Sequence, residues 1–85
     1  MRIVWDERKR QANLAKHGMD FAALDLDFFA SAIVRLSHSG RMLALGRQGD
    51  EMILAVAFRP LGFEGVSIIS MRPASQAERR FYEQS

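Results

Sequence analysis

Apolar and polar positions follow two different periods along this chain, a helical one near the N-terminus and a strand-like one further on. Residues 2–5 alternate briefly and predict a short first strand. Residues 7–17 predict a helix that starts after Asp6, whose carboxylate can cap free amide groups, and ends at Gly18, which can adopt a left-handed conformation. Both ends of this helix are therefore marked in the sequence.

A second helix is predicted over residues 20–29, with Asp20 as its N-terminal cap. Apolar side chains recur there at three- and four-residue spacing: Phe21, Leu24 and Phe28. This is the pattern of a helix that packs one face against a hydrophobic core.

From residue 32 onward the pattern predicts consecutive strands joined by short polar connections. We expect strands over residues 32–37, 41–47, 52–58 and 66–71, with turns at 38–40 and 48–50 and a break at 59–62. A last helix begins near Ser75, where Ser75 and Glu78 have the spacing of a capping box.

This order of elements predicts an α+β fold in a single domain, residues 1–85. We expect a short first strand, two N-terminal helices, a mainly antiparallel sheet of about four to five strands and a C-terminal helix, with the helices gathered on one side of the sheet.

The first predicted helix has few apolar side chains and many polar ones. Lys9, Asn13, Lys16 and His17 are spaced so that they share one flank of the helix. Such a flank can hold a phosphate backbone, but a solvated surface explains the same pattern. His17, beside Gly18, can also simply bond the last carbonyl groups of the helix.

Composition narrows the classes of function. No run approaches the roughly 18 apolar residues of a membrane span, and no signal peptide is visible, so we expect a cytoplasmic protein. The absence of cysteine excludes thiolate nucleophiles and zinc–thiolate sites. Ten of the twelve cationic residues are arginine, whose planar fork matches phosphate oxygens in pairs. A GC-rich genome, which favours arginine over lysine on any surface, is an alternative explanation for the excess of arginine.

A second set of polar residues lies in the later strands and the last helix: Arg41, Arg59, Arg72, Glu78, Arg79, Arg80 and Tyr82. Arg72 directly follows a buried strand, so a rigid element would hold it, as suits an anion-binding group. A salt bridge to Glu78 or Asp50 is the alternative explanation for this arginine.

The motifs of several familiar sites are absent, including glycine-rich phosphate loops, His-Glu-x-x-His and the nucleophile elbow. The side chains that remain as candidates for catalysis are those of arginine, lysine, histidine and tyrosine. This set suits RNA cleavage without a metal or cofactor, in which a base removes the 2′-hydroxyl proton, cations stabilise the phosphate and an acid protonates the leaving oxygen.

Two stretches of the chain resemble the BrnT toxin family. Its opening pattern W-D-x-x-K-x-x-x-N-x-x-K-H-G-x-x-F is matched by Trp5-Asp6, Lys9, Asn13, Lys16-His17-Gly18 and Phe21. Its ending, R-I-I-S-A-R-x-A followed by E-R-x-x-Y, is similar to Ile68-Ile69-Ser70-Met71-Arg72, Ala74, Glu78-Arg79 and Tyr82.

The resemblance implies a type II toxin with a RelE-like fold, an endoribonuclease that inhibits translation. Its partner would be a BrnA-like antitoxin whose ribbon-helix-helix domain binds the operator DNA. On this interpretation Lys9, Arg41 and Arg72 are phosphate-binding cations, His17 transfers a proton, and Tyr82 is a substrate contact or acid. Asn13, Lys16, Arg59 and Arg79 would contact RNA.

Three positions depart from the family pattern. Ser67 stands where an arginine is usual, Gly40 stands where many members carry an acidic residue, and residues 60–65 match only loosely, which affects the assignment of Arg59. These departures leave an alternative function open, that of a weakened or inactive relative that binds its antitoxin or nucleic acid.

Overall fold

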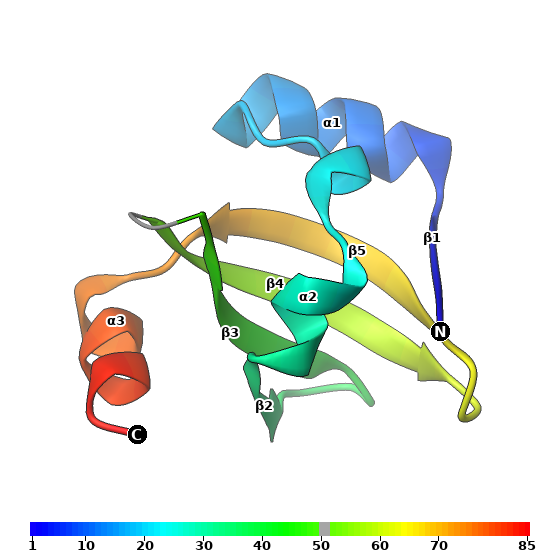
Figure 1. The fold of residues 1–85 in the computed structure, drawn as a ribbon. Helices are drawn as coiled ribbons and strands as arrows, with labels where there is room; N and C mark the ends of the chain where they lie inside the picture. The colour runs from blue at the N-terminus through cyan, green and yellow to red at the C-terminus, as the bar shows by residue number, and fades with distance from the viewer. Residues whose placement is uncertain (50–51) are drawn as a thin grey trace.

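The computed structural model describes residues 1–49 and 52–85, which form a five-stranded sheet and short helices (Figure 1). The elements are β1 (Arg2–Trp5), α1 (Glu7–His17), the 3-10 helix η1 (Phe21–Ala23), α2 (Leu26–Ala30), β2 (Ile33–Leu36), β3 (Met42–Gln48), β4 (Met52–Leu61), β5 (Gly65–Pro73) and α3 (Gln76–Glu83). The strand order is β1-β5-β4-β3-β2, in which β1 pairs with β5 in parallel and the other pairs are antiparallel. The α+β prediction is confirmed.

The predicted boundaries of α1 are confirmed. The Asp6 side chain accepts a hydrogen bond from the Arg8 amide at 2.8 Å. Gly18 has φ 67°, and its N–H donates to the Leu14 carbonyl at 2.8 Å. The start of α3 is also as predicted, because Ser75 and Glu78 form both hydrogen bonds of a capping box.

The predicted helix over residues 20–29 is wrong as one element, because it is broken into η1 and α2. Leu24 and Asp25 between them have extended backbones, with ψ of 140° and 179°. The Asp25 carboxylate accepts from the Phe28 amide at 2.9 Å, so it caps a new helix instead of continuing the first. Phe21, Leu24 and Phe28 are nevertheless buried, as their spacing predicted.

β4 also differs from the prediction, since it continues through Pro60 to Leu61 and forms a hairpin with β5. β3 begins only at Met42, opposite Phe58, so this end of β4 has β5 as its single neighbour in the sheet. Proline is tolerated there because no second strand requires its missing N–H. The predicted turn at 48–50 lies partly outside the described residues.

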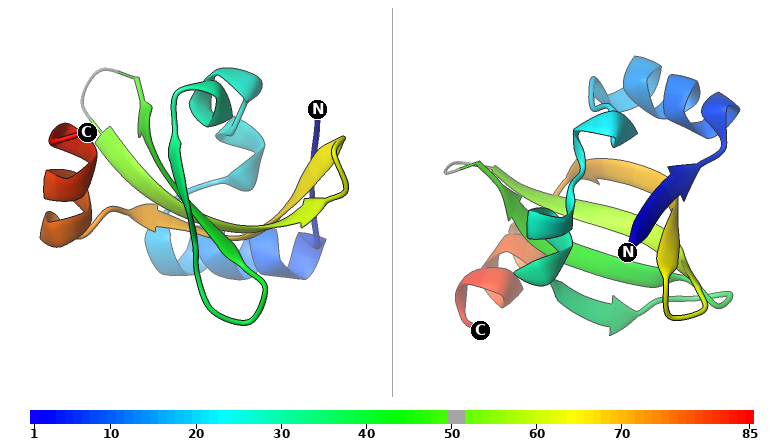
Figure 2. Two further views of the ribbon diagram at one scale, coloured as in Figure 1. Left: turned by 90° about the horizontal axis from the view of Figure 1, so that it is seen from below. Right: turned by 45° about the vertical axis from the view of Figure 1, so that its right-hand side comes forward.

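The helices do not all lie on one side of the sheet, in contrast to the expectation. η1 and α2 cover one face, where Phe21 and Phe28 pack with Val56 and Ile68. In the left view of Figure 2, α1 lies on the other side of the sheet from α2, and α3 lies at the end of the sheet. Leu45, which faces away from this core, is also fully buried, and α3 contacts its strand β3.

A bulge in β5 decides which way its last residues point. Ile68 pairs with Phe58 and Ser70 pairs with Ala57, so Ile69 is an extra residue without a counterpart. Ile68 and Met71 consequently both enter the core, each 1% exposed. In an unbroken strand, residues 66, 68, 70 and 72 would share the core face. The bulge instead turns Arg72 to the opposite face.

Candidate functional site

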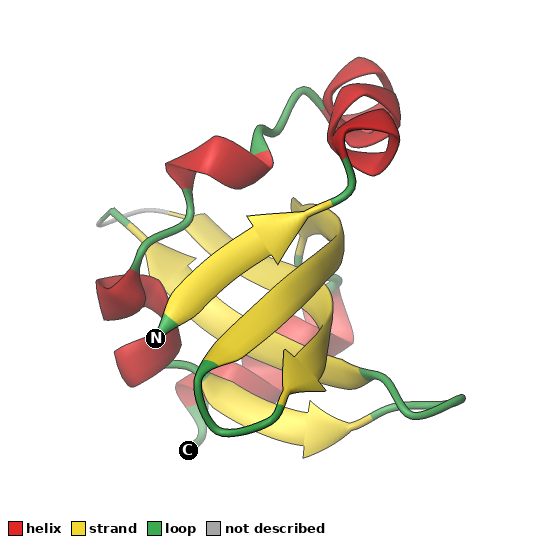
Figure 3. Ribbon diagram, turned by 90° about the vertical axis from the view of Figure 1, so that its right-hand side faces the viewer, coloured by secondary structure: helices red, strands yellow, loops and turns green. Residues whose placement is uncertain are grey.

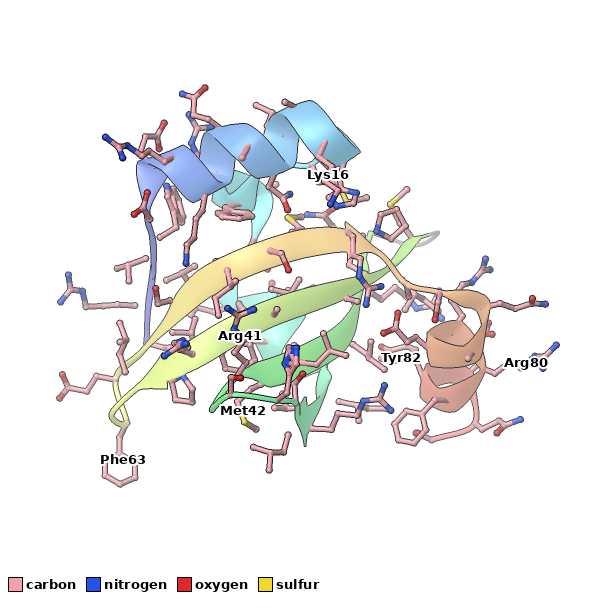
Figure 4. The ribbon with its side chains drawn as sticks, turned by 180° about the vertical axis from the view of Figure 1, so that it is seen from behind. Lys16, Arg41, Met42, Phe63, Arg80 and Tyr82 are labelled. Atoms are coloured by element: carbon pink, nitrogen blue, oxygen red, sulfur yellow. The ribbon has the colours of Figure 1, made fainter. Side chains whose placement is uncertain are left out.

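The sheet face opposite η1 and α2, here called the open face, carries several of the predicted site residues. Arg59 pairs with Ser67, and continuing the β3–β4 register beyond Met42 and Phe58 places Arg41 opposite Arg59. Arg59 and Ser67 are neighbours on β4 and β5, and Arg41, which directly precedes β3, extends their row. Figure 4 shows Arg41 near the middle of this face, between α1 and α3.

Arg41 is held by a tight turn between β2 and β3. Ser39 and Gly40 have φ of 57° and 72°, and the Arg41 N–H donates to the His38 carbonyl at 3.1 Å, as in a type I′ turn. The glycine that departs from the family pattern thus suits the backbone of this turn. The Arg41 Nε atom is buried and has no hydrogen-bond partner within residues 1–49 and 52–85. A buried N–H of this kind is stabilised when an anion oxygen accepts from it.

Arg72 lies on the open face but is already engaged by α3. Its Nη1 and Nη2 donate to Oε1 and Oε2 of Glu78 at 2.7 and 3.0 Å, and Nη1 also donates to the Pro73 carbonyl at 3.2 Å. The Glu78 side chain is only 11% exposed, and these bonds lower its pKa to about 2. Of the two explanations for Arg72, the salt bridge to Glu78 is observed. The other suggested partner, Asp50, is outside the described residues.

α1 and β5 border a shallow cleft of about 210 Å³. Its lining residues are Lys9, Ala12, Asn13, Lys16, His17, Ile69 and Ser70. Ser70 belongs to the side of β5 that also carries Arg72, so the polar flank of α1 and Arg72 share one side of the sheet. Figure 4 shows Lys16 at the C-terminal end of α1, above this side.

Asn13 joins α1 to the free edge of β5. Its Nδ2 donates to the carbonyls of Met71 and Met19 at 2.9 and 3.1 Å, and its Oδ1 accepts from the Met71 amide at 3.0 Å. β1 ends opposite Ile68, so the Asn13 amide continues the pairing that β1 leaves incomplete. Asn13 is 7% exposed, and the fold therefore accounts for this residue of the motif without an RNA contact.

A salt-bridge cluster positions the other end of α1. Arg10 donates to the carboxylates of Glu7 and Asp20, with closest distances of 2.7 and 3.0 Å, and so links α1 to the turn that precedes η1. The same Glu7 accepts from the indole N–H of Trp5 at 3.3 Å. The Trp5 ring meets Phe21 edge-on, with their centroids 6.3 Å apart. The aromatic residues of the opening motif are thus structural.

Tyr82 lies away from the cleft of α1. It lines a hollow with Ser31, Ile33 and Arg47, and the Arg47 guanidinium stands 5.8 Å from the centroid of its ring. The structure does not bring Tyr82 and His17 into one pocket. Arg79, the remaining predicted RNA contact, is exposed on α3.

Three residues of this side were missed by sequence reasoning: Arg35, Arg47 and Ser70. Arg35 stands 5.3 Å from the ring of Phe81 on α3. Arg47 follows Arg41 by an even number of residues, and such a spacing in a strand places both side chains on the same face. This alternation could have identified Arg47. The ending motif contains Ser70, but strand alternation alone would assign it to the core face, because its direction depends on the bulge.

The described part of the chain contains neither a metal-binding cluster nor a membrane-spanning helix. No group of three or more His, Asp or Glu side chains there could hold a metal ion. Within the same residues, no helix has the length and apolar character needed to cross a bilayer.

Comparison with known proteins identifies the family of this chain. A profile of the family described as "Ribonuclease toxin, BrnT, of type II toxin-antitoxin system" matches residues 5–78. The chain belongs to this family. The chain is also similar to the Brucella abortus ribonuclease toxin BrnT, known from a 1.1 Å crystal structure, with 53% identity and a TM-score of 0.83. That match covers 89% of this chain and 99% of the Brucella chain. No curated protein sequence matches significantly.

A ribonuclease must bind phosphates, and the open face carries the cationic side chains of Arg41, Arg59 and Arg72. The usual BrnT arginine that Ser67 replaces would stand beside Arg59 in the row that also holds Arg41. One cation is therefore missing from this row, and two remain.

Proposed function

We propose that this BrnT-family ribonuclease binds single-stranded RNA across its open face and cleaves it there without a metal ion. The proposal is supported chiefly by the row of Arg41 and Arg59, in which the buried Arg41 Nε lacks an acceptor within the described residues. The guanidinium groups of this row can donate to phosphate oxygens, and preorganised cations stabilise charge that develops in the transition state.

The chemistry needs one proton removed and one donated. The 2′-oxygen attacks the phosphorus after a base takes its proton, the bond to the 5′-oxygen breaks, and an acid protonates this leaving oxygen. We assign phosphate binding to Arg41 and Arg59, and proton transfer to His17 in the cleft of α1. Lys9 and Lys16 bind a flanking phosphate from the same cleft.

Arg72 has a narrower role in this proposal. Glu78 occupies two of its N–H groups, so Arg72 contributes its positive charge from a fixed position and does not grip a phosphate with its fork. Tyr82 and Arg79 on α3 remain candidate substrate contacts, and the separation of Tyr82 from the cleft of His17 argues against Tyr82 as the acid.

Membership in a type II toxin–antitoxin family implies an antitoxin partner. We propose a BrnA-like antitoxin with a ribbon-helix-helix domain, which binds operator DNA and blocks the open face of the toxin, in the cytoplasm. The alternative of an inactive binding module predicts no cleavage at all.

Cleavage of single-stranded RNA in the presence of EDTA tests the proposal. We expect Arg41→Ala to lower kcat/KM by roughly 100- to 1000-fold, as for other removed transition-state donors. Arg59→Ala should weaken binding and reduce the salt slope by about 0.7, the value for one lost phosphate contact on a single strand.

Arg80→Ala is the matched control, because Arg80 projects from α3 away from the open face (Figure 4). Full activity of the Arg41 variant, or an equal loss in the Arg80 variant, would contradict the assignment. An inactive but folded wild-type protein would support the binding-module alternative.

A further inference from the structure

An apolar corner adjoins the arginine row of the open face. Val4 pairs with Ser67 in β1–β5, so it belongs to the same face as Arg59. Leu61, two residues beyond Arg59 in β4, has the same orientation and is 48% exposed. These two residues line a small hollow of about 170 Å³ with Arg2, Glu64 and Gly65.

Phe63 stands beside this hollow, at the tip of the β4–β5 hairpin, and is fully exposed. Figure 4 shows its ring projecting away from the body of the protein. No aromatic or cation contact of this ring is found within residues 1–49 and 52–85. We call Val4, Leu61 and Phe63 the apolar corner.

The hairpin tip is held in place by several contacts. The Glu64 N–H donates to the Leu61 carbonyl at 3.4 Å, and the Arg2 N–H donates to the Glu64 carbonyl at 2.7 Å. Figure 3 shows β1, which starts at the N-terminus, beside the β4–β5 hairpin. The exposed ring is therefore carried by a turn that is bonded to two strands.

We propose that the apolar corner binds one unpaired base of the RNA, with Phe63 stacking on it. This inference rests on the proposed function. Bases present an apolar face and a polar edge, and the lining of the hollow combines the apolar Val4 and Leu61 with the polar Arg2 and Glu64. Its continuity with the row of Arg41 and Arg59 favours RNA over a protein partner, because a strand whose phosphates bind this row carries its bases past the corner.

Stacking on an aromatic ring requires a base that is free of a duplex. The corner consequently directs the enzyme to single-stranded RNA. It also gives the enzyme a contact that the phosphate-binding arginines cannot supply, because phosphates are the same at every position.

The test measures binding of 2′-O-methyl oligonucleotides, which lack the attacking hydroxyl group and are not cleaved. We expect Phe63→Ala to weaken binding by about 5- to 150-fold, the range for loss of one stacked base. Phe63→Trp should bind at least as tightly as the wild type, whereas Phe63→Leu should resemble Phe63→Ala. Blunt duplex RNA should bind all four proteins alike.

A series of oligonucleotides with one abasic position each locates the bound base. One position should weaken binding to the wild type at least as much as Phe63→Ala does, and should have a smaller effect in that variant than in the wild type. Leu36→Ala is the control, since Leu36 is 75% exposed but pairs with Met42, on the other side of the sheet.

Wild-type affinity of Phe63→Ala, or of Phe63→Leu, would overturn the stacking assignment. Weaker binding of the antitoxin with unchanged RNA binding would overturn it too, and would identify a protein contact instead. Failure of the proposed function gives a different result: the wild type does not cleave RNA, or Arg41→Ala cleaves it as fast as the wild type does.

Discussion

Replacement of Asn13 by alanine tests whether the fold depends on the link between α1 and β5. The substitution removes three hydrogen bonds and leaves the amide and carbonyl of Met71 buried without partners. Each unsatisfied buried group costs about 1–3 kcal/mol, and the better helix propensity of alanine returns at most about 0.7 kcal/mol. We expect the free energy of unfolding to fall by about 2–4 kcal/mol.

Urea denaturation followed by the fluorescence of Trp5, the only tryptophan, measures this loss directly. For a chain of this size the melting temperature should fall by roughly 10–30 °C. Gln11→Ala is the control, because Gln11 is exposed on α1 and, within residues 1–49 and 52–85, its amide bonds only Glu7, at 3.1 Å. A loss below about 0.5 kcal/mol for Asn13→Ala, or equal to that of the control, would refute the reasoning.

Asn13→Asp sharpens the same test through its dependence on pH. The carboxylate can still accept from the Met71 amide, but its second oxygen would face two carbonyl oxygens. Burial and this repulsion favour the protonated form, so the variant should gain stability relative to the wild type as the pH falls. Equal pH dependence of the two proteins would argue against the assigned hydrogen bonds.

Two further predictions concern the core and the ion pair with α3. A Cβ at Gly46 would lie 2.8 Å from the ring of Phe28. Gly46→Ala should therefore lower the free energy of unfolding, measured in urea, by about 1–3 kcal/mol. An unchanged free energy of unfolding would show that the ring can move. Arg72 lowers the pKa of Glu78 from 4.5 to about 2, so the ion pair stabilises the folded state fully above pH 4.5 and is lost as the pH falls towards 2. Glu78→Gln should therefore cost about 1–3 kcal/mol near neutral pH, with the difference from the wild type narrowing between pH 4.5 and 2; a constant difference in unfolding free energy across that range would contradict it.

The helix boundaries could be predicted because their causes are local. Asp6 and Gly18 act on amide and carbonyl groups within a few residues, and Ser75 and Glu78 complete a capping box three residues apart. The same local chemistry explains the one wrong helix. Asp25 is also a cap, and its bond to the Phe28 amide outweighed the helical spacing of the apolar residues.

The site could be predicted only in part. The motif indicated that Lys9, Asn13, Lys16 and His17 share one flank of α1. All four of them line the cleft. Sequence could not separate their tasks. The hydrogen-bond partner of Asn13 is Met71, which lies 58 residues further along the chain. The role of Asn13 as a link to β5 is therefore visible only once the sheet has assembled.

By itself, the sequence determined the α+β class, both ends of α1, the start of α3 and the family, because caps, periodicity and motifs are written in neighbouring residues. Only the tertiary structure decided which face the arginines share. Strand alternation places Arg72 in the core, and the extra residue Ile69 reverses this by letting Ile68 and Met71 both fill it. A bulge is set by pairing between two strands, and pairing is not encoded in either strand alone.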